Sequence, residues 1–356
     1  MADKTPVLIL DGGLGTSLED KYGVSFSSAS TPLWSSHLLV SDPETLLRCQ
    51  RDFGDCPVDV IETATYQVSI DGFTSTKTEG RPNGVDLDSI PDFLERAVQI
   101  ANEAKGKAEC RIALSLGPYG ACMIPSQEYS GAYDKGHDTA EKLREWHLQR
   151  LHCFTKVERL FDRVQFVAFE TLPRTDEIVA VRSLYDQLAT SGTFPPEFVK
   201  GFLRTPFWIS CVFPGDDDML PDGSSVYQAV ETMLSPNISA ITPWGIGINC
   251  TKINKLPSII EAYERAVVIM VTKRKLSQWP SLVLYPDGTN GEVYNTETQR
   301  WELPEGNQKP DIPWEIQLAN VVEMAANRGR WRSILVGGCC KTSHQDIKNL
   351  IRAIGV

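Results

Sequence analysis

Residues 165–188 read QFVAFETLPRTDEIVAVRSLYDQL and contain both elements from which this fold is built. The first six residues form a nearly continuous apolar run ending in Glu170, which is typical of a strand buried on both faces in a parallel sheet. The Thr-Asp-Glu that follows places acidic residues in the first turn of a helix over Thr175–Leu188. This stretch therefore predicts a strand followed by a helix.

The same pattern occurs eight times along the 356 residues. The predicted strands are Val7–Asp11, Val58–Glu62, Arg111–Ser115, Gln165–Glu170, Phe207–Phe213, Trp244–Cys250, Ser281–Tyr285 and Ser333–Gly338. The predicted helices are Pro43–Phe53, Ile90–Ala104, Thr139–Leu160, Thr175–Leu188, Ser225–Leu234, Leu256–Lys273, Pro313–Asn327 and Thr342–Ala353. This alternation favours an α/β fold, a single (β/α)8 TIM barrel formed by residues 1–356 as one domain. Periodicity does not show closure, so an open sheet and two smaller α/β domains are the alternatives.

Two longer segments interrupt the pattern. Ser69–Ser89 follows the second predicted strand and Tyr285–Asp311 follows the seventh, and both are rich in the Gly, Asp, Asn, Thr and Pro of loops. In a barrel both lie at the C-terminal ends of the strands, which we call the mouth. Barrel enzymes hold their active sites there.

The charge balance disfavours two classes of partner. Lys and Arg number 35 against 46 Asp and Glu, a formal net charge of −11, so neither nucleic acid nor an anionic membrane surface is attracted. No apolar run approaches the roughly 18 residues of a membrane span, and the N-terminus lacks the pattern of a secretory signal. We expect a cytoplasmic protein whose nine cysteines stay reduced.

Carboxylates and thiols end most of the predicted strands. In chain order the strand ends read Asp11-Gly-Gly, Glu62-Thr, Ser115-Leu, Glu170-Thr, Asn249-Cys250 and Gly337-Gly-Cys339-Cys340. A single cysteine at a strand end is more often a core residue than a ligand. Because the strand ends of a barrel converge on one mouth, the combination favours a functional site.

Cys339 and Cys340 give the sharpest local signal. Consecutive residues of a regular strand point to opposite faces, so the backbone must leave strand geometry for both thiols to reach one ion. We attribute this to Gly337 and Gly338, which allow unusual torsions. In a closed barrel, Cys250 lies two strands away and supplies a third sulfur. Three thiolates without a fourth protein ligand describe a catalytic zinc site with an open position.

The glycine-rich turn after the first strand predicts an anion site. DGGLGT has neither the dinucleotide-binding nor the P-loop spacing. The N–H groups of Gly12 and Gly13 can still hold a carboxylate.

The five histidines add little to this site. His147 and His152 fall inside a long predicted helix and are expected to be partly exposed. His344 lies four residues beyond Cys340 and is a weaker candidate ligand.

Together these motifs resemble those of the homocysteine S-methyltransferase family. DGGLGT, ETATYQ, LGPYGA, FET-x-P, GINC and GGCC occur in the family's order over nearly the whole chain. The most specific combination is GINC followed, after 88 intervening residues, by the cysteine pair of GGCC.

The resemblance implies that Cys250, Cys339 and Cys340 bind one Zn²⁺ and are catalytic, with the homocysteine sulfur at the open position. A free thiol has a pKa near ~8.5, and coordination to zinc deprotonates it. Three protein thiolates leave the bound substrate sulfur electron-rich, so it stays nucleophilic. Attack on a methyl sulfonium then needs no general base.

The resemblance also implies how the amino-acid part of homocysteine is bound. Asp11 and Glu170 receive the ammonium group, and the backbone near Gly12 takes the carboxylate. Asn249, the neighbour of Cys250, is the remaining expected substrate contact.

Several methyl donors fit the resemblance. Folate- and cobalamin-dependent members are larger chains, and betaine enzymes have a C-terminal extension and an aromatic residue where this chain has Thr171. We therefore expect S-methylmethionine as the donor, S-adenosylmethionine as the second choice and betaine as the alternative. Trp34, Tyr66, Tyr119 and Trp244 are candidates to flank a sulfonium through cation–π contacts.

Two other classes of protein share part of this pattern. A zinc-dependent hydrolase on the same barrel uses an open site to activate water, but hydrolytic zinc usually takes His and carboxylate ligands. A non-enzymatic zinc or redox-sensing protein binds the ion without turnover. Methionine formation from homocysteine, with a 1:1 zinc content unchanged by mild oxidation, excludes the non-enzymatic class.

Overall fold

The computed structural model describes residues 5–27, 30–295, 300–303 and 310–355. Eight strands form one sheet, and a two-stranded pair lies apart from it. The eight are β1 (Val7–Ile9), β2 (Val60–Glu62), β3 (Arg111–Leu116), β4 (Phe166–Leu172), β5 (Phe207–Cys211), β6 (Gly245–Asn249), β7 (Ser281–Tyr285) and β10 (Ile334–Val336). Each falls within or overlaps one of the eight predicted strands, so the strand predictions are confirmed.

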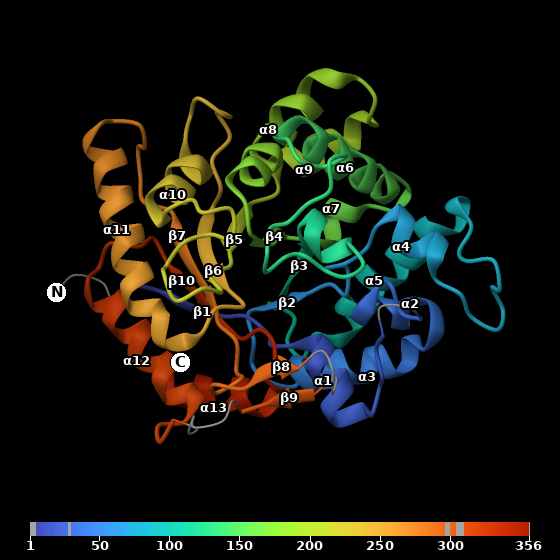
Figure 1. Cartoon of the computed structure of the whole chain (residues 1–356), viewed down its shortest axis with the longest axis horizontal. Helices are drawn as coiled ribbons and strands as arrows, with labels where there is room; N and C mark the ends of the chain where they lie inside the picture. Colours follow the sequence, from blue (N-terminus) through green and yellow to red (C-terminus); the bar gives the residue numbers. More distant parts are fainter. Residues whose placement is uncertain (1–4, 28–29, 296–299, 304–309, 356) are drawn as a thin grey trace.

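The sheet closes into a barrel. Its order is β1-β10-β7-β6-β5-β4-β3-β2, and all neighbouring strands are parallel. The two outermost strands meet through a bridge between Leu10 and Val60, and the Asp59 carboxylate accepts a hydrogen bond from the Ile9 N–H at 2.8 Å. Figure 1 shows the strands at the centre with helices around them. The barrel prediction is confirmed, and the open sheet is wrong.

Two hydrophobic layers explain why the strands are apolar on both faces. The barrel interior is filled by Leu10, Val60, Ala113, Phe166, Ala168, Trp208, Val283, Tyr285 and Leu335. Alternate strand residues such as Ile9 and Ile61 join the larger core between the sheet and the helices. Because successive strand residues face opposite layers, both must be apolar.

Thirteen helices of the described chain surround the sheet. They are α1 (Leu14–Tyr22), α2 (Leu38–Ser41), α3 (Pro43–Gly54), α4 (Ile70–Ser75), α5 (Ile90–Ala104), α6 (Ala140–Cys153), α7 (Leu160–Arg163), α8 (Thr175–Ser191), α9 (Pro196–Arg204), α10 (Val226–Leu234), α11 (Leu256–Thr272), α12 (Trp314–Asn327) and α13 (His344–Ile354). All eight predicted helices are present. Local capping supports them, as where the Asp42 carboxylate accepts from the Thr45 N–H at 3.0 Å at the start of α3.

Some helix predictions are wrong. The helix expected over Thr139–Leu160 ends at Cys153, where the chain turns, and Arg159 adopts a left-handed φ of +48°. Sequence reasoning also missed α1, α2, α4, α7 and α9. Helix α1 starts inside a glycine-rich turn and is held by packing, since a Cβ on Gly15 would lie 2.2 Å from the Trp34 ring.

Both insertions follow the C-terminal ends of their strands, as expected. Ser69–Ser89 contains α4 and a short 3₁₀ turn. Tyr285–Asp311 contains β8 (Val293–Asn295) and β9 (Arg300–Glu302), which pair antiparallel. Residues 296–299 and 304–309 of this insertion lie outside the described residues.

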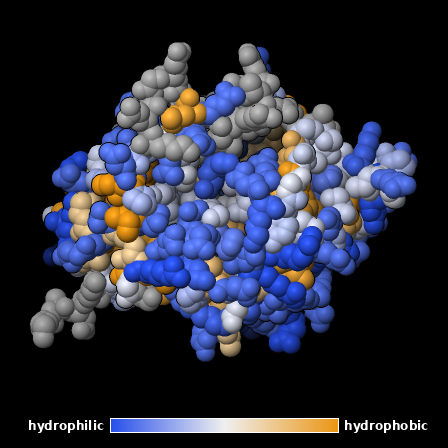
Figure 2. All heavy atoms as spheres, turned by 90° about the horizontal axis from the view of Figure 1, so that it is seen from below, coloured by the Kyte–Doolittle hydropathy of each residue, from blue (hydrophilic) through white to orange (hydrophobic). Residues whose placement is uncertain are grey.

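The described surface carries no sign of a membrane span. None of the helices in the described ranges combines the length and apolar character needed to cross a bilayer. The face in Figure 2 is covered mainly by hydrophilic side chains, with hydrophobic ones in small separate groups.

Candidate active site

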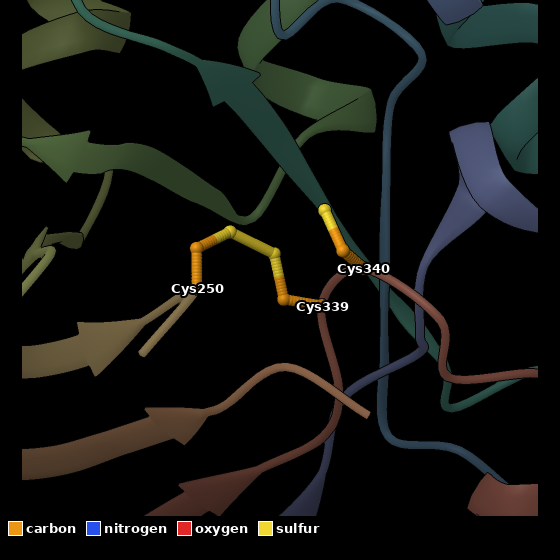
Figure 3. A group of neighbouring side chains, drawn as sticks. All are labelled: Cys250, Cys339 and Cys340. Atoms are coloured by element: carbon orange, nitrogen blue, oxygen red, sulfur yellow. A yellow bond between two sulfur atoms is a disulfide. The ribbon is translucent and has the colours of Figure 1, made fainter. Parts of the chain in front are cut away.

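Three cysteines meet at the mouth of the barrel. Cys250 follows β6, while Cys339 and Cys340 follow β10, and their sulfur atoms all lie within 4.8 Å of one another. Figure 3 shows the side chains approaching one point from two segments of the chain. The structure thus brings together the three residues that the sequence suggested as ligands.

Cys250 and Cys339 are joined by a disulfide, whereas Cys340 is a free thiol. The expectation that all nine cysteines stay reduced is wrong for this pair. Their Cα atoms lie 5.5 Å apart despite a sequence separation of 89 residues, because only β7 lies between their strands. A metal ion needs both sulfurs as thiolates, so this bond must be reduced before metal binds.

The chemistry of the donor set fits zinc. Three sulfurs are soft ligands of the kind that select Zn²⁺. Burial raises the pKa of Cys340 to about 12, and Asp287 adds to the rise, so the thiol alone is neutral at pH 7. A bound cation reverses this preference by stabilising the thiolate. Across the described ranges this trio is the one group with ligand spacing, and His344 is not part of it.

The backbone turns sharply around the cysteines. Cys250 has a φ of +47° and Lys341 a φ of +61°, in the left-handed region that such residues rarely adopt. Gly337 and Gly338 do not have positive φ, so the torsional role expected for them is wrong. A Cβ on Gly337 would lie 2.5 Å from the Asp11 carbonyl oxygen, and one on Gly338 2.2 Å from a neighbouring hydroxyl oxygen. Both positions require glycine because the chain passes too close to its neighbours.

Three carboxyl groups from separate strands gather at the same mouth. Asp11 follows β1, Glu62 ends β2 and Glu170 lies in β4. The Asp11 carboxylate accepts a hydrogen bond from the Glu62 N–H at 3.0 Å, and the Ser115 hydroxyl donates to Glu170. Burial raises the pKa of Asp11 to about 8, that of Glu170 to about 7 and that of Glu62 well above its usual range. Repulsion from Glu170 also raises the pKa of Asp11 and Glu62.

These carboxyl groups have no positively charged partner among the residues that the structure describes. None of the groups that shift their pKa values in the described part of the protein is a cation. One oxygen of Glu62 is buried and has no hydrogen-bond partner among the described residues. The cluster is therefore suited to an ammonium group from a ligand, which stabilises the ionised form of each carboxyl. Sequence reasoning noted Glu62 at a strand end but gave it no role.

The start of α1 offers one backbone donor rather than two. The Gly13 N–H already donates to the Thr342 carbonyl oxygen at 2.9 Å and to its hydroxyl at 3.0 Å, so the prediction that it holds an anion is wrong. The Gly12 N–H donates no hydrogen bond to any described residue. It lies where α1 begins, next to the positive end of the helix dipole.

Asn249 is fully buried and engaged by its neighbours. Its side-chain oxygen accepts from the Thr171 N–H at 2.8 Å, and its amide donates to the Thr171 hydroxyl at 2.7 Å and to the Cys250 sulfur at 3.4 Å. Thr171 has a left-handed φ of +60°. Asn249 thus clamps the end of β4 to the end of β6 and orients Cys250.

The four aromatic candidates lie in different places. Tyr66 lies at the mouth, where its hydroxyl is next to Thr171. Trp34 packs over α1, and Tyr119 stacks on a histidine of its own loop with ring centroids 3.9 Å apart. Trp244 contacts Phe166 at the opposite end of the barrel, with centroids 4.9 Å apart, so its predicted role beside the sulfonium is wrong. Trp244 precedes its strand, whereas the mouth receives the residues that follow strands.

The loop between β3 and α6, residues 117–139, adds residues that sequence reasoning missed. The Tyr129 hydroxyl lies next to the Cys340 side chain, while the residue as a whole is 44% exposed. The preceding Glu128 is only 8% exposed. The sequence marks neither residue, because a polar loop has no periodicity from which burial can be predicted.

His147 is buried at 1% exposure, so the expectation of partial exposure is wrong. Its ring contacts the buried Glu177 carboxylate at 3.0 Å, and the Arg150 guanidinium lies 2.8 Å from its other nitrogen. Hydrogen-bonding partners in the helix layer therefore allow His147 to be buried, although the helix pattern predicts that it lies near solvent.

The fold and the cysteine cluster define a (β/α)8 barrel that gathers three cysteines and three buried carboxyl groups at its mouth. The family model described as homocysteine S-methyltransferase matches residues 8–354. The chain therefore belongs to the homocysteine S-methyltransferase family. It is a methyltransferase, and the family reaction is methyl transfer to homocysteine.

Plant proteins are among the similar sequences. Homocysteine S-methyltransferase 1 of Brassica oleracea var. italica is 27% identical over 362 residues, covering 97% of this chain and 92% of the relative. Homocysteine S-methyltransferase 4 of Zea mays is 28% identical, covering 97% and 89% of the two chains.

Solved structures of one bacterial protein share the fold. The homocysteine methyltransferase MmuM from Escherichia coli aligns in its metallated form with a TM-score of 0.63 and 24% identity, covering 98% of this chain and 96% of that one. Its oxidized form aligns with a TM-score of 0.66 and 24% identity, covering 98% and 97%.

Proposed function

We propose that this protein, acting as one domain over residues 1–356, methylates homocysteine from a sulfonium donor with the help of a zinc ion. The proposed ligands are Cys250, Cys339 and Cys340. The donor is S-methylmethionine, with S-adenosylmethionine as the second choice. The observation that carries the proposal is the approach of three cysteine sulfurs to within 4.8 Å at the end of the barrel where uncompensated carboxyl groups gather.

The amino-acid end of homocysteine fits the groups beside the cysteines. Asp11, Glu170 and Glu62 take its ammonium group, which supplies the positive charge that the described residues around them do not. The Gly12 N–H, at the start of α1, takes its carboxylate. Asn249 acts through Thr171 and Cys250 rather than by touching the substrate, since these two residues engage its amide.

The reaction is a displacement at the methyl carbon. Zinc bound to the three cysteines supplies deprotonation of the substrate thiol at neutral pH. The homocysteine sulfur contributes the electron pair of the new S–C bond, and the pair of the broken bond stays on the donor sulfur. The sulfonium becomes a neutral thioether, so S-methylmethionine and homocysteine yield two molecules of methionine. Opposite charges cancel in the transition state, which burial from water favours.

The bacterial relative supports a site that exists in two chemical states. Its structures are described as metallated and oxidized forms. We propose the same pair of states here, with the Cys250–Cys339 disulfide as the oxidized one. Metal binding then requires a reducing compartment, and we propose the cytoplasm.

Metal analysis tests the ligand assignment. Reduced protein incubated with zinc and then freed of unbound metal should retain about one zinc per chain, because three thiolates bind zinc tightly. Cys340→Ala should retain little, while Cys153→Ala, a half-buried thiol on α6, should match the wild type. Full zinc content in Cys340→Ala would contradict the assignment.

A donor panel tests the reaction. Homocysteine is supplied with S-methylmethionine, S-adenosylmethionine or betaine, and methionine is quantified. We expect turnover with a sulfonium. Turnover with betaine alone would identify the alternative donor, and no methionine with any donor would favour a zinc hydrolase or a non-enzymatic zinc or redox-sensing protein.

A further inference from the structure

Glu128 is a buried carboxyl group whose bonding is incomplete. It is 8% exposed, and its Oε2 atom is buried without a hydrogen-bond partner in the described part of the chain. The Glu128 carboxyl group accepts hydrogen bonds from the Ser126 side chain and from the Glu128 backbone, which lower its pKa. Burial has the larger effect and raises the pKa of Glu128 to about 7. A carboxyl oxygen left this way costs folding free energy unless a ligand completes it.

Glu128 lies at the cysteine site. The next residue, Tyr129, places its hydroxyl beside Cys340, and the Glu128 charge raises the pKa of that thiol. The Glu128 charge also raises the pKa of Tyr66, though less than burial does, and the Tyr66 hydroxyl is next to Thr171 at the end of β4. Glu128 and the two tyrosines therefore lie close to Cys340 and to the end of β4.

The loop that carries Glu128 is held firmly. The Gln127 N–H donates to the Gly120 carbonyl oxygen at 2.8 Å. The buried Glu177 carboxylate accepts from the Tyr119 N–H at 2.7 Å and from the Tyr133 hydroxyl at 2.5 Å, which fixes both arms of the loop to α8. The position of Glu128 is thus set before a ligand arrives.

Glu128 is separate from the groups proposed to bind homocysteine. Asp11, Glu62 and Glu170 interact with one another, and Glu128 is not among the groups that shift their pKa values. The second substrate therefore remains as its partner. A sulfonium has no N–H to donate to an oxygen, but an amino-acid sulfonium carries an α-ammonium group that does.

We propose that Glu128 binds the α-ammonium group of the methyl donor, with Tyr66 and Tyr129 bordering the same subsite. Glu128 thereby selects amino-acid sulfonium donors over betaine, whose only positive nitrogen bears no hydrogen. This inference rests on the proposed sulfonium-dependent function. The aromatic rings are placed to face the sulfonium, while the carboxylate completes its bonding with the ammonium.

Calorimetry with two ligands tests the subsite. The reduced, zinc-loaded protein, without homocysteine, is titrated with S-methylmethionine and with (3-carboxypropyl)dimethylsulfonium, the same sulfonium without the amino group. Glu128→Gln should raise the Kd of S-methylmethionine about 10- to 100-fold, as expected for the loss of a charge-assisted hydrogen bond, and change that of the desamino ligand less than about threefold. Glu128→Asp, which keeps the charge, should fall between the wild type and Glu128→Gln.

The controls separate binding from folding. Glu141→Gln, on the exposed surface of α6, should leave both Kd values unchanged. Zinc content and the KM for homocysteine should be unaltered in Glu128→Gln; if that variant fails to fold, Glu128→Asp carries the same two-ligand comparison. Equal weakening of both ligands, or no weakening of either, would overturn the role of Glu128. A wild-type protein that uses betaine and neither sulfonium would instead overturn the proposed function, and the donor subsite with it.

Discussion

At the scale of single residues, burial converts ordinary carboxyl groups into receptors for a positive charge. Asp11 at the mouth has its pKa raised from 3.8 to about 8, first by desolvation and then by Glu170. A ligand ammonium placed among these groups favours their ionised forms and lowers their pKa values. Ligand binding must therefore release protons near neutral pH.

Methionine is the ligand that tests this proton release, because it has the ammonium group but no thiol. Titrated at pH 7 in buffers of different ionisation enthalpy, the binding heat should vary with the buffer and report release of up to about one proton. Asp11→Asn should reduce the release. A binding heat independent of buffer would contradict a protonated carboxyl cluster.

The same groups make stability depend on pH. Asp11 has a folded-state pKa of about 8 against its ordinary value of 3.8, so between these pH values the folded state holds a proton that the unfolded chain has lost. Its contribution is therefore fully present below about pH 4 and is lost as the pH rises toward 8. Urea unfolding of the ligand-free protein should show a decline in unfolding free energy over this range, and Asp11→Asn should show a smaller one. An equal decline in both proteins would exclude Asp11 as its source.

At the scale of elements, the loop over residues 117–139 depends on one buried side chain. Glu177 in α8 accepts hydrogen bonds from both arms of the loop and contacts His147 of α6. The loop over residues 117–139, which borders the mouth, is thus fixed by α8 in the layer of helices around the sheet. Losing one of these bonds should loosen the loop without opening the sheet.

Tyr133→Phe removes the hydroxyl that donates to Glu177 at 2.5 Å. We expect a loss of about 1.5–3 kcal/mol in unfolding free energy, as for a hydrogen bond to a carboxylate, together with faster hydrogen exchange of loop amides. Tyr227→Phe, on α10, is the matched control with the same chemical change. Exchange rates in the loop equal to those of the control would show that Glu177 does not hold it.

At the scale of the whole molecule, the barrel closes where the first and second strands meet. The Asp59 carboxylate accepts from the Ile9 N–H at 2.8 Å and pairs with Lys107 at 2.9 Å, while backbone hydrogen bonds join the same strands. Closure of the barrel therefore depends on contacts between residues that lie about 50 positions apart in the first third of the chain.

Asp59→Ala should lower the unfolding free energy by about 2 kcal/mol, because the Ile9 N–H loses its carboxylate partner. Asp59→Asn, which retains an acceptor oxygen, should lose less, and Asp55→Ala, on the exposed side of the same turn, should lose little. Denaturant unfolding measures all three. If Asp59→Ala were as stable as Asp55→Ala, the contact between β1 and β2 would be held by backbone hydrogen bonds alone.

The sequence by itself was enough to predict the eight strands and the eight principal helices. It also indicated which three of the nine cysteines come together at the mouth. Strands buried on both faces are apolar throughout, and helices begin with residues typical of helix starts. Both kinds of element can therefore be recognised from neighbouring residues in the sequence. The sequence also placed the cysteines, Asp11 and Glu170 together, because parallel strands of a barrel share one mouth.

The tertiary structure alone decided what depends on contacts between distant segments. It closed the barrel through the bridge between Leu10 and Val60 and joined Cys250 to Cys339. It also placed Trp244 at the end of the barrel opposite the mouth. It also buried Glu128 beside the cysteine site. The physical reason is that burial and the pKa shifts it causes depend on neighbours in space, whereas a sequence pattern records only neighbours along the chain.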